Sequence, residues 1–354
     1  MIIFLINNLK TIRKGTLLTK VLFVDGQPGC GKTMFTPIIS SFNRLEIFNY
    51  SSEIENICAL NFLKKISYDA ALSMIKIQLD LFLYETMMSR RANFRPTDVS
   101  SVFKNPNCMK YLDRLMSKGD ELVPEKIKKE KPILHFASHN LLAFSNPIFD
   151  SSKNKVFFIE IVRHPLYQLI QQTINYKKSS TIRGSSRYFA IRIKYKNHQI
   201  PYRFVGNEKE YINCNEVEKA IFDMNLVQKL TDNNKKNISR KNKNKIMTIP
   251  FELFALNPYP YIKKIEIFLN TTVSKNTKNS LIEQNVPRKK ICDGIPLDVY
   301  KRCGWKPPIK NFTERDELNL RRGFALKSRA RKKYMDILDK MSNHYEKKYL
   351  GGIL

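Results

Sequence analysis

The chain has 354 residues, of which 42% are hydrophobic and 11% aromatic. This composition excludes a disordered protein and is enough for a full α/β core. The 62 Lys and Arg against 32 acidic residues give a net charge of +30, which suits nucleic acid, an anionic surface or an anionic small molecule. The basic residues are spread along a chain that is also rich in Asn and Ile, and this favours compositional bias and solvated faces.

Neither membrane insertion nor metal binding is indicated. The N-terminal MIIFLI is too short for a signal peptide or a membrane span, and no later stretch of spanning length lacks charges. The six cysteines show no C-x-x-C spacing and no accompanying histidine cluster, so we expect no zinc site. These features predict a soluble, cytoplasmic protein with reduced thiols. The sequence carries no signal for the oligomeric state.

In chain order, the first expected element is an apolar strand at 20–25 (KVLFVD), which ends at the loop GQPGCGKT. We expect a helix over 31–43 that kinks or shifts register near Pro37, because proline lacks the backbone donor of the helix ladder. The following segments are expected as a second strand and two helices: 44–50, 53–65 and 68–90.

Three more apolar runs predict strands further along the chain, at 132–138, 155–162 and 245–250. Helices are expected at 166–176 and from about Pro260 to Asn270. Strands that alternate with helices, the first feeding a phosphate loop, predict an α/β fold. We expect a single domain over 1–354, a three-layer α/β/α sandwich with a central parallel sheet.

Three segments depart from this alternation. The pattern breaks over 177–215, where RYFAIRIKYKNHQIPYRFVG alternates at period two around Lys196–Asn197, which predicts a hairpin inserted at the carboxyl edge of the sheet. The basic run 234–245 reads as an exposed, flexible connection. The tail 314–348 is charged and periodic, which predicts a helix or a helix pair.

The loop GQPGCGKT fits the phosphate-binding pattern G-x-x-x-x-G-K-[ST]. The backbone N–H groups of Gly29 to Thr33 and the positive end of the next helix make an anion site, and Lys32 adds a point charge. The pattern identifies a phosphate rather than ATP. The residues expected to contact it are Gly26, Gln27, Pro28, Gly29, Cys30, Gly31, Lys32 and Thr33.

A protein that uses ATP normally holds Mg²⁺ through a carboxylate at a neighbouring strand end. The best candidate is Glu160 in KVFFIEIV, yet the strand continues past it, which favours a polar residue that points off the sheet or pairs with a lysine. A Mg-ATP-dependent kinase or ATPase remains the alternative enzyme. An RNA-binding protein that uses the basic runs 234–245 and 321–333 is a third hypothesis.

A second anion site is indicated by Arg163-His164-Pro165, which closes the strand 155–162. The carboxyl ends of parallel strands meet at one edge, so the Arg163 guanidinium is expected beside the phosphate loop. A planar guanidinium can hold a phosphate through two parallel hydrogen bonds. Two phosphate sites imply a ligand that is phosphorylated at both ends of its ribose.

Taken together, these motifs resemble the sulfotransferases, which transfer a sulfuryl group from 3′-phosphoadenosine-5′-phosphosulfate (PAPS). The resemblance consists of strand–GQPGCGKT–helix, strand–RHP–helix and IMTIPFELFALNPYPYIKKIEIFLN, and runs from about Val21 to Leu269. It implies that the loop binds the 5′ end of PAPS and Arg163 the 3′-phosphate, with adenosine 3′,5′-bisphosphate as product. It also implies that no metal is required, that the acceptor is the hydroxyl of a glycan or small metabolite, and that no nucleic acid is bound.

The sequence also departs from the family pattern. Lys32 stands where family members usually have Ser or Thr, and Gln171 stands eight residues after the arginine where they have a serine. Gln171 can still donate to a phosphate. A basic segment near the C-terminus that reaches the 3′-phosphate in the cytosolic branch is loosely resembled by VPRKKICDG, which makes Arg288 and Lys289 candidates.

Sulfuryl transfer needs a cation at the leaving oxygen, for which Lys32 is suited, and a base at the acceptor hydroxyl. His139 in LHFASHNLL resembles the catalytic histidine turn of the cytosolic branch, whereas His135 within the strand is expected to be a core histidine. The carbohydrate branch uses a glutamate instead. Its candidates here are Glu46, Glu53 and Glu55, of which Glu53 ranks first because it follows the strand 44–50 directly.

Overall fold

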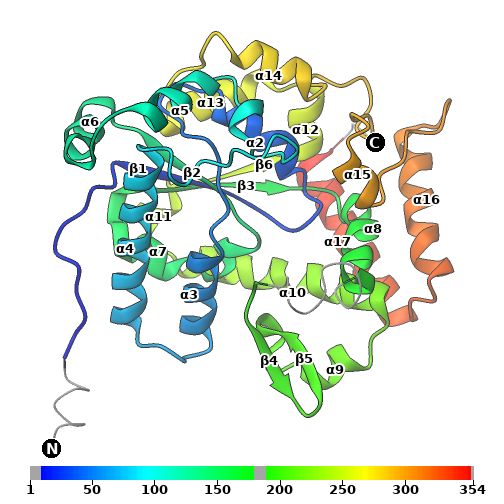
Figure 1. Ribbon diagram of the computed structural model, residues 1–354. Helices are drawn as coiled ribbons and strands as arrows, with labels where there is room; N and C mark the ends of the chain where they lie inside the picture. The colour runs from blue at the N-terminus through cyan, green and yellow to red at the C-terminus, as the bar shows by residue number, and fades with distance from the viewer. Residues whose placement is uncertain (1–8, 179–188, 352–354) are drawn as a thin grey trace, which may run out of the picture.

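The computed structural model describes residues 9–178 and 189–351. Within these residues, four parallel strands form the central sheet in the order β2-β1-β3-β6 (Figure 1). The phosphate loop follows β1, an inner strand of this sheet, so groups from both neighbouring strand ends lie beside it. The strands are β1 (Lys20–Asp25), β2 (Ile133–Ala137), β3 (Val156–Val162) and β6 (Ile246–Pro250).

Helices cover both faces of the sheet, so the expected α/β/α class is confirmed. Successive side chains of β1 alternate between the layers, with Leu22 and Val24 in one apolar cluster and Val21 and Phe23 in the other. The first layer contains α2 (Lys32–Ser40), α12 (Phe251–Leu256), α13 (Tyr259–Leu269) and α14 (Thr277–Glu283). The second contains α3 (Ser52–Phe62), α4 (Tyr68–Thr86), α7 (Asn146–Ser152) and α10 (Glu216–Asn237).

A third apolar cluster extends the molecule beyond the carboxyl edge and joins α8, α10, α16 and α17. The expected C-terminal helical tail is confirmed as the pair α16 and α17. The remaining helices are α5 (Cys108–Met116), α6 (Val123–Glu130), α8 (Pro165–Lys178), α9 (Glu208–Ile212), α11 (Arg240–Lys243), α15 (Asp298–Arg302), α16 (Glu314–Lys327) and α17 (Lys332–Tyr349). Pro37 lies inside α2 without ending it, so only the boundaries of that helix differ from expectation.

The strand expected at 44–50 is wrong. This segment runs beside β2 but makes only isolated parallel bridges to it, Leu45 with Ile133 and Asn49 with Phe136. The segment keeps backbone hydrogen bonds to β2 at both bridges, but four residues of the segment separate bridges that are three residues apart on β2, so the register is interrupted by one extra residue. Between the bridges the N–H of Ile47 donates to the Tyr111 hydroxyl of α5 at 2.6 Å.

The expected hairpin is confirmed as β4 (Arg192–Tyr195) and β5 (His198–Pro201), which pair antiparallel around Lys196 and Asn197. Residues 179–188 of the predicted insertion lie outside the described residues. The flexible connection expected at 234–245 is wrong, because α10 runs into this segment and α11 follows it. The Asn234 side chain anchors the end of α10 by donating to the carbonyl oxygen of Leu142 at 2.7 Å.

All six cysteines are free thiols. Across residues 9–178 and 189–351, none of the helices combines the length and the apolar character that a membrane span needs. The MIIFLI segment at 1–6 lies outside the described residues.

Candidate active site

The loop after β1 folds tightly because its three glycines adopt positive φ. Gly26, Gly29 and Gly31 have φ of 150°, 88° and 103°, which residues with a side chain disfavour. A Cβ on Gly31 would also lie only 2.2 Å from the Phe251 ring. Gly31 is the N-cap of α2 and offers no side-chain cap. The N–H groups of the first turn are therefore available to an anion.

Lys32 begins α2, and its side chain folds back under the loop. The Nζ donates to the carbonyl oxygens of Gly26 at 2.6 Å and Gln27 at 3.2 Å. It also lies 3.6 Å from the Sγ of Cys30, a thiol whose pKa is raised by burial. The structure thus places a buried positive charge at the centre of the loop, where an anion would meet it.

Arg163 follows β3 and lies against the loop. Its Nη1 donates to the carbonyl oxygen of Gly29 at 2.9 Å. Its Cζ lies 4.2 Å from the ring centroid of Phe251 and 5.1 Å from that of Tyr167, distances that allow cation–π attraction. Burial lowers the pKa of Arg163, and its Nε finds no hydrogen-bond partner among the described residues. Two rings hold this guanidinium in place while part of its donor capacity stays unused.

Arg288 brings a second guanidinium to the same ring, with its Cζ 5.3 Å from the Phe251 centroid. Burial, followed by the charge of Arg163, lowers the pKa of Arg288 to about 10. The buried Tyr300 hydroxyl has no partner in the part of the chain that is described. Burial raises the pKa of Tyr300 to about 12, although the charges of both arginines oppose that rise. Lys289 is exposed, so the predicted basic pair separates and only Arg288 packs here.

Glutamines of α8 border the loop. The Gln171 side chain lies beside Gly29. A Cβ atom added to Gly29 would lie 3.2 Å from the Oε1 of Gln171. The next residue, Gln172, makes the hydrogen bonds to the loop. Its Nε2 donates to the carbonyl oxygen of Pro28 at 3.2 Å and to the Oε1 of Gln27 at 3.3 Å. Gln171 therefore lies where a phosphate could receive its donor, and Gln172 braces the loop.

The turn after β2 is organised by Asp25 at the end of β1. The Asp25 Oδ1 accepts from the Ser138 hydroxyl at 2.8 Å and the Leu141 N–H at 3.1 Å. Its Oδ2 accepts from the Leu142 N–H at 2.8 Å. Because a buried carboxylate needs such donors, this network fixes the turn against the phosphate loop. The turn carries His139, the expected base.

His139 is half exposed, and its backbone N–H donates to the Oε1 of Glu55 at 3.0 Å. Its Nδ1 lies 3.9 Å from the same oxygen, and its ring stacks on Tyr50 with centroids 6.1 Å apart. Burial raises the pKa of Glu55 to about 7, with a further rise from Asp25 and an opposing effect of Lys32. A carboxyl group that ionises near neutrality thus lies beside the imidazole.

The other residues considered for the base lie elsewhere. Glu53 is exposed and accepts from Arg91 at 3.4 Å, whereas Glu55 accepts from the backbone of His139 in the turn after β2. Glu46 is buried in an ion pair network under α5. His135 is a core residue whose Nδ1 lies 3.1 Å from the Ser40 hydroxyl, and burial lowers its pKa to about 3.

Glu160, the candidate magnesium ligand, is engaged within β3 and its neighbours. Its Oε2 accepts from the Lys235 Nζ and from the Thr248 hydroxyl, the latter at 2.7 Å. A lysine that binds this oxygen competes with a cation for it. Over the described ranges, no group of three His, Cys, Asp or Glu side chains could hold a metal ion.

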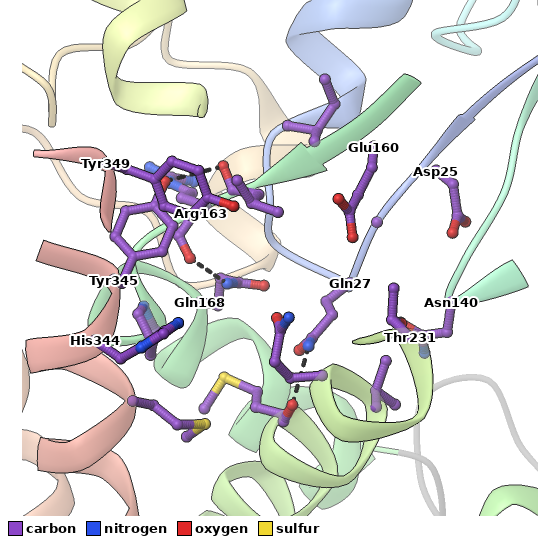
Figure 2. A pocket seen from close by; sticks show the side chains of 18 of the residues that line it. Asp25, Gln27, Asn140, Glu160, Arg163, Gln168, Thr231, His344, Tyr345 and Tyr349 are labelled. Carbon is purple, nitrogen blue, oxygen red and sulfur yellow. Dashed lines mark hydrogen bonds between the residues drawn. The ribbon is translucent and has the colours of Figure 1, made fainter. Parts of the chain in front are cut away.

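A cleft opens beneath the loop, at the carboxyl ends of β1 and β3. It encloses about 790 Å³ of empty space, counted with its open mouth. Figure 2 shows Asp25, Glu160 and Asn140 on one side of the cleft, and Tyr345 and Tyr349 of α17 on the other.

Sequence reasoning does not identify four residues at the site: Phe251, Tyr167, Gln172 and Tyr300. It also ranks Glu53 ahead of Glu55 as the candidate glutamate. Phe251 directly follows the strand expected at 245–250, and Tyr167 lies one helical turn after Arg163. Both positions belong to the carboxyl edge of the sheet, so an aromatic residue there is the signal that could have identified them. Tyr300 lies far along the chain and gives no comparable signal.

No protein-family model matches the chain, and no curated protein sequence matches it. Among solved structures, it is similar to the sulfotransferase domain of the olefin synthase from Synechococcus PCC 7002, with 12% identity, 90% of this chain and 98% of that chain covered, and a TM-score of 0.36. The sulfotransferase domain from the curacin biosynthetic pathway gives 10% identity, coverages of 90% and 99%, and a TM-score of 0.41. A mouse sulfotransferase complexed with PAP gives 11% identity, with 91% of this chain and 89% of that chain covered, and a TM-score of 0.34. At these values the likeness does not establish an activity, and the proposal below rests on this chain's own residues.

Proposed function

We propose that the chain is a sulfotransferase that moves a sulfuryl group from PAPS to an acceptor hydroxyl. The observation that carries the proposal is the pair of half-buried guanidiniums beside the phosphate loop. Arg163 and Arg288 share the Phe251 ring, and neither forms an ion pair with a carboxylate in the described chain. Two like charges held this close favour an anion between them. The loop supplies the first anion site and the arginines the second, as a ribose phosphorylated at two positions requires.

The hydrogen bonds that Glu160 already makes argue against the alternative function, a Mg-ATP-dependent kinase or ATPase. The carboxylate at the expected position already accepts from Lys235 and Thr248. An enzyme that uses ATP also needs cations around a triphosphate. A sulfuryl donor with separate phosphates needs instead the two spaced cation sites that this chain provides.

In the proposed reaction Lys32 stabilises the charge that develops on the leaving oxygen. Its Nζ is already aimed into the loop by two backbone carbonyl oxygens, so little reorganisation is required when the anion arrives. Arg163, Arg288 and Gln171 hold the phosphate at the other end of the ribose. In this scheme none of the described residues acts as a metal ligand.

His139 takes the proton of the acceptor hydroxyl, and Glu55 replaces Glu53 as the alternative base. His139 is accessible at the mouth of the site, and Glu55 lies against it. The pKa of Glu55, raised to about 7 by burial, is close to the value at which a carboxylate accepts protons efficiently under neutral conditions.

The first test is calorimetry with adenosine 3′,5′-bisphosphate in the absence of Mg²⁺. We expect micromolar binding, which Arg163→Ala weakens by about 2–3 kcal/mol because a charged hydrogen bond is lost. Arg288→Ala should weaken it by at least about tenfold, whereas Lys289→Ala, its exposed neighbour, should change it less than about twofold. Tight binding of Mg·ATP without binding of the bisphosphate would falsify the proposal.

The second test identifies the base. We expect His139→Ala to lower the turnover number by about 100-fold, as the loss of a general base does, with unchanged affinity for the bisphosphate. Glu53→Gln is the matched control for Glu55→Gln, because only Glu55 lies beside the turn. If Glu55 is the base, turnover rises as pH passes about 7, and Glu55→Gln removes that rise. Full activity of His139→Ala together with an inactive Glu55→Gln would reverse the two roles.

A further inference from the structure

The four strands of the central sheet each begin at or just after a lysine. Lys20 is the first residue of β1, and Lys155 and Lys245 directly precede β3 and β6. Lys131 lies two residues before β2. Because the strands are parallel and paired from these ends, the four lysines meet at one edge of the sheet. We call this edge, opposite the phosphate loop, the amino edge.

Two of the ammonium groups share one aromatic ring. The Nζ of Lys20 lies 4.8 Å from the ring centroid of Phe157, and that of Lys245 lies 4.3 Å from it. Burial, followed by the charges of Arg44 and Lys245, lowers the pKa of Lys20 to about 8. Burial, followed by the charge of Lys241, also lowers the pKa of Lys245. Like charges are thus held together in partly dehydrated surroundings, where an anion would stabilise them.

Backbone carbonyl oxygens hold these cations in place. The Nζ of Lys155 donates to the carbonyl oxygen of Leu18 at 2.6 Å. The Nε of Arg44 donates to the carbonyl oxygen of Lys131 at 2.9 Å. A neutral carbonyl oxygen fixes the position of a cation but does not cancel its charge, so the positive charge of the amino edge persists.

The stretches of chain that form the amino edge contain few acidic residues. No Asp or Glu occurs at 1–24, 151–159 or 233–251. Glu130, the acidic residue next to the lysine of β2, pairs with Arg114 at 3.0 Å. Among the residues that the structure describes, none of the four strand-start lysines forms an ion pair. The charge of this edge is therefore left for a partner.

More exposed groups surround the four lysines. Lys153 lies in the turn before β3, and Lys241 and Lys243 lie on α11; all three are exposed. Ile267, in the last turn of α13, is 73% exposed. The end of α13 reaches the amino edge, because its last carbonyl oxygen accepts from the Lys20 Nζ. The edge thus combines clustered lysines with an exposed aliphatic side chain beside them.

We propose that the amino edge is a docking surface for a lipid bilayer with anionic headgroups. Clustered lysines attract anionic headgroups as point charges, without a fixed geometry, and an exposed aliphatic side chain can enter the interface. Single-stranded nucleic acid would need accessible rings on which its bases stack, yet Phe157 is buried. A protein partner would need an apolar interface centre, whereas the centre of this edge is cationic.

Docking at the amino edge turns the reaction centre away from the bilayer. The phosphate loop follows the opposite end of β1, a strand of six residues, so the two edges are roughly 20 Å apart. Figure 1 shows α8 and α17 at the carboxyl end of β3, and α11 beyond the other end. The inference does not rest on the proposed function, and a bound nucleotide should not compete with the bilayer.

The test is co-sedimentation of the full chain with lipid vesicles at physiological salt. We expect binding to vesicles of phosphatidylcholine and phosphatidylserine in a two-to-one ratio, and at least about tenfold weaker binding to phosphatidylcholine alone. The edge variant carries Lys153→Glu, Lys241→Glu and Lys243→Glu. It should bind the mixed vesicles at least about tenfold more weakly than wild type, because each of these lysines adds to the attraction.

The matched control makes the same change of charge on α16 and α17, at the exposed positions Lys327, Lys340 and Lys347, each replaced by Glu. It should change vesicle binding by less than about threefold, because charges far from the bilayer are screened by salt. An equal loss in both variants would show general attraction to a basic protein and overturn the assignment. Displacement of the chain from vesicles by adenosine 3′,5′-bisphosphate would also overturn it, because the lipid phosphate would then occupy the loop.

The edge variant leaves Lys20, Lys155 and Lys245 in place, so we expect its urea midpoint to match that of wild type. If the midpoint falls, the triple glutamine variant at the same positions replaces it, and unchanged vesicle binding of that variant would contradict the proposal. Vesicle binding should be absent in neither the wild type nor the control. Edge-dependent binding of duplex RNA or polyglutamate without vesicle binding would overturn the lipid assignment in favour of a nucleic acid or an acidic protein.

Discussion

At the scale of single residues, Phe251 links the two halves of the anion site. Its ring fills the space beside Gly31 in the phosphate loop and also carries the guanidiniums of Arg163 and Arg288. The phosphate loop and the second cation site are therefore mechanically coupled through one side chain. A change that displaces this ring should affect both ends of a bound nucleotide.

Gly31→Ala tests this coupling. The new Cβ would meet the Phe251 ring at 2.2 Å on a backbone with φ of 103°, so we expect bisphosphate affinity to fall by at least about 100-fold. Gly323→Ala is the control, because a Cβ there meets nothing within 4 Å. In that half-buried helical position with open space for a Cβ, alanine should stabilise the fold by about 0.5–1 kcal/mol in chemical denaturation. Unchanged calorimetry of Gly31→Ala would contradict the coupling.

At the scale of elements, α5 and the segment 44–50 are joined by a buried charge. The Glu46 carboxylate accepts from Lys110 at 2.8 Å, from the Tyr111 hydroxyl at 2.9 Å and from Arg114 at 2.8 Å. The same Tyr111 hydroxyl accepts from the Ile47 N–H. This network joins the segment to α5, in addition to the backbone hydrogen bonds that join it to β2, and α3 with Glu55 follows directly from the segment.

Glu46→Gln should lower the free energy of unfolding by about 3–5 kcal/mol at pH 7, because it breaks a buried ion pair and leaves Arg114 with only the half-exposed carboxylate of Glu130, at 3.0 Å. Burial alone would raise the pKa of Glu46, but Lys110 and Arg114 outweigh it and lower the pKa. A lowered folded-state pKa gives stability that is present above the ordinary carboxyl pKa and is lost as pH falls through the folded value. Urea titrations should therefore show the wild-type advantage at pH 7 and its decline in acid. Glu121→Gln, at an exposed position, should behave like wild type at both pH values, and an equal loss in both variants would contradict the network's role.

At the scale of the whole molecule, the net charge of +30 is not changed by intramolecular ion pairs, but these pairs engage part of the two basic runs. Residues of both basic runs that were considered for RNA binding form intramolecular ion pairs. These pairs are Lys235–Glu160, Arg321–Glu317, Arg322–Asp339, Arg331–Glu218, Lys332–Asp336 and Lys333–Glu210. The runs also lie on different helices, so they do not form one continuous tail.

Binding of homopolymer RNA should accordingly be non-specific. We expect filter-binding affinity to fall by about 1,000-fold or more between 50 and 200 mM salt, since such binding depends on counterion release. Binding of the bisphosphate, held in a buried site, should depend much less on salt. Saturable RNA binding that persists at 200 mM salt would restore the third hypothesis.

Features of the fold and site are predictable from the sequence where they depend on residues close together in the chain, and not where they depend on residues far apart in it. Residues 20–25, the phosphate loop and Arg163 are recognised because strand, loop and strand end are local patterns whose meeting point follows from parallel pairing. The segment 44–50 misleads because its pairing with β2 slips by one residue between Leu45 and Asn49, which its apolar pattern does not reveal. Glu53 and Glu55 both lie in the first turn of α3, and only Glu55 is on the side of the helix that contacts the turn at His139. The cleft is not predictable locally, because α17 closes it from the far end of the chain.

That distance along the chain has a consequence for biosynthesis. His164, next to Arg163, is bound through its ring Nε2 to the carboxylate of Glu346 at 3.2 Å, 182 residues later. At bacterial to eukaryotic elongation rates this separation corresponds to roughly 10–40 s on the ribosome. Residues of the phosphate loop and Arg163 are therefore synthesised well before α17, the helix that contributes Tyr345 and Tyr349 to the cleft. The cleft is completed only when this last helix docks.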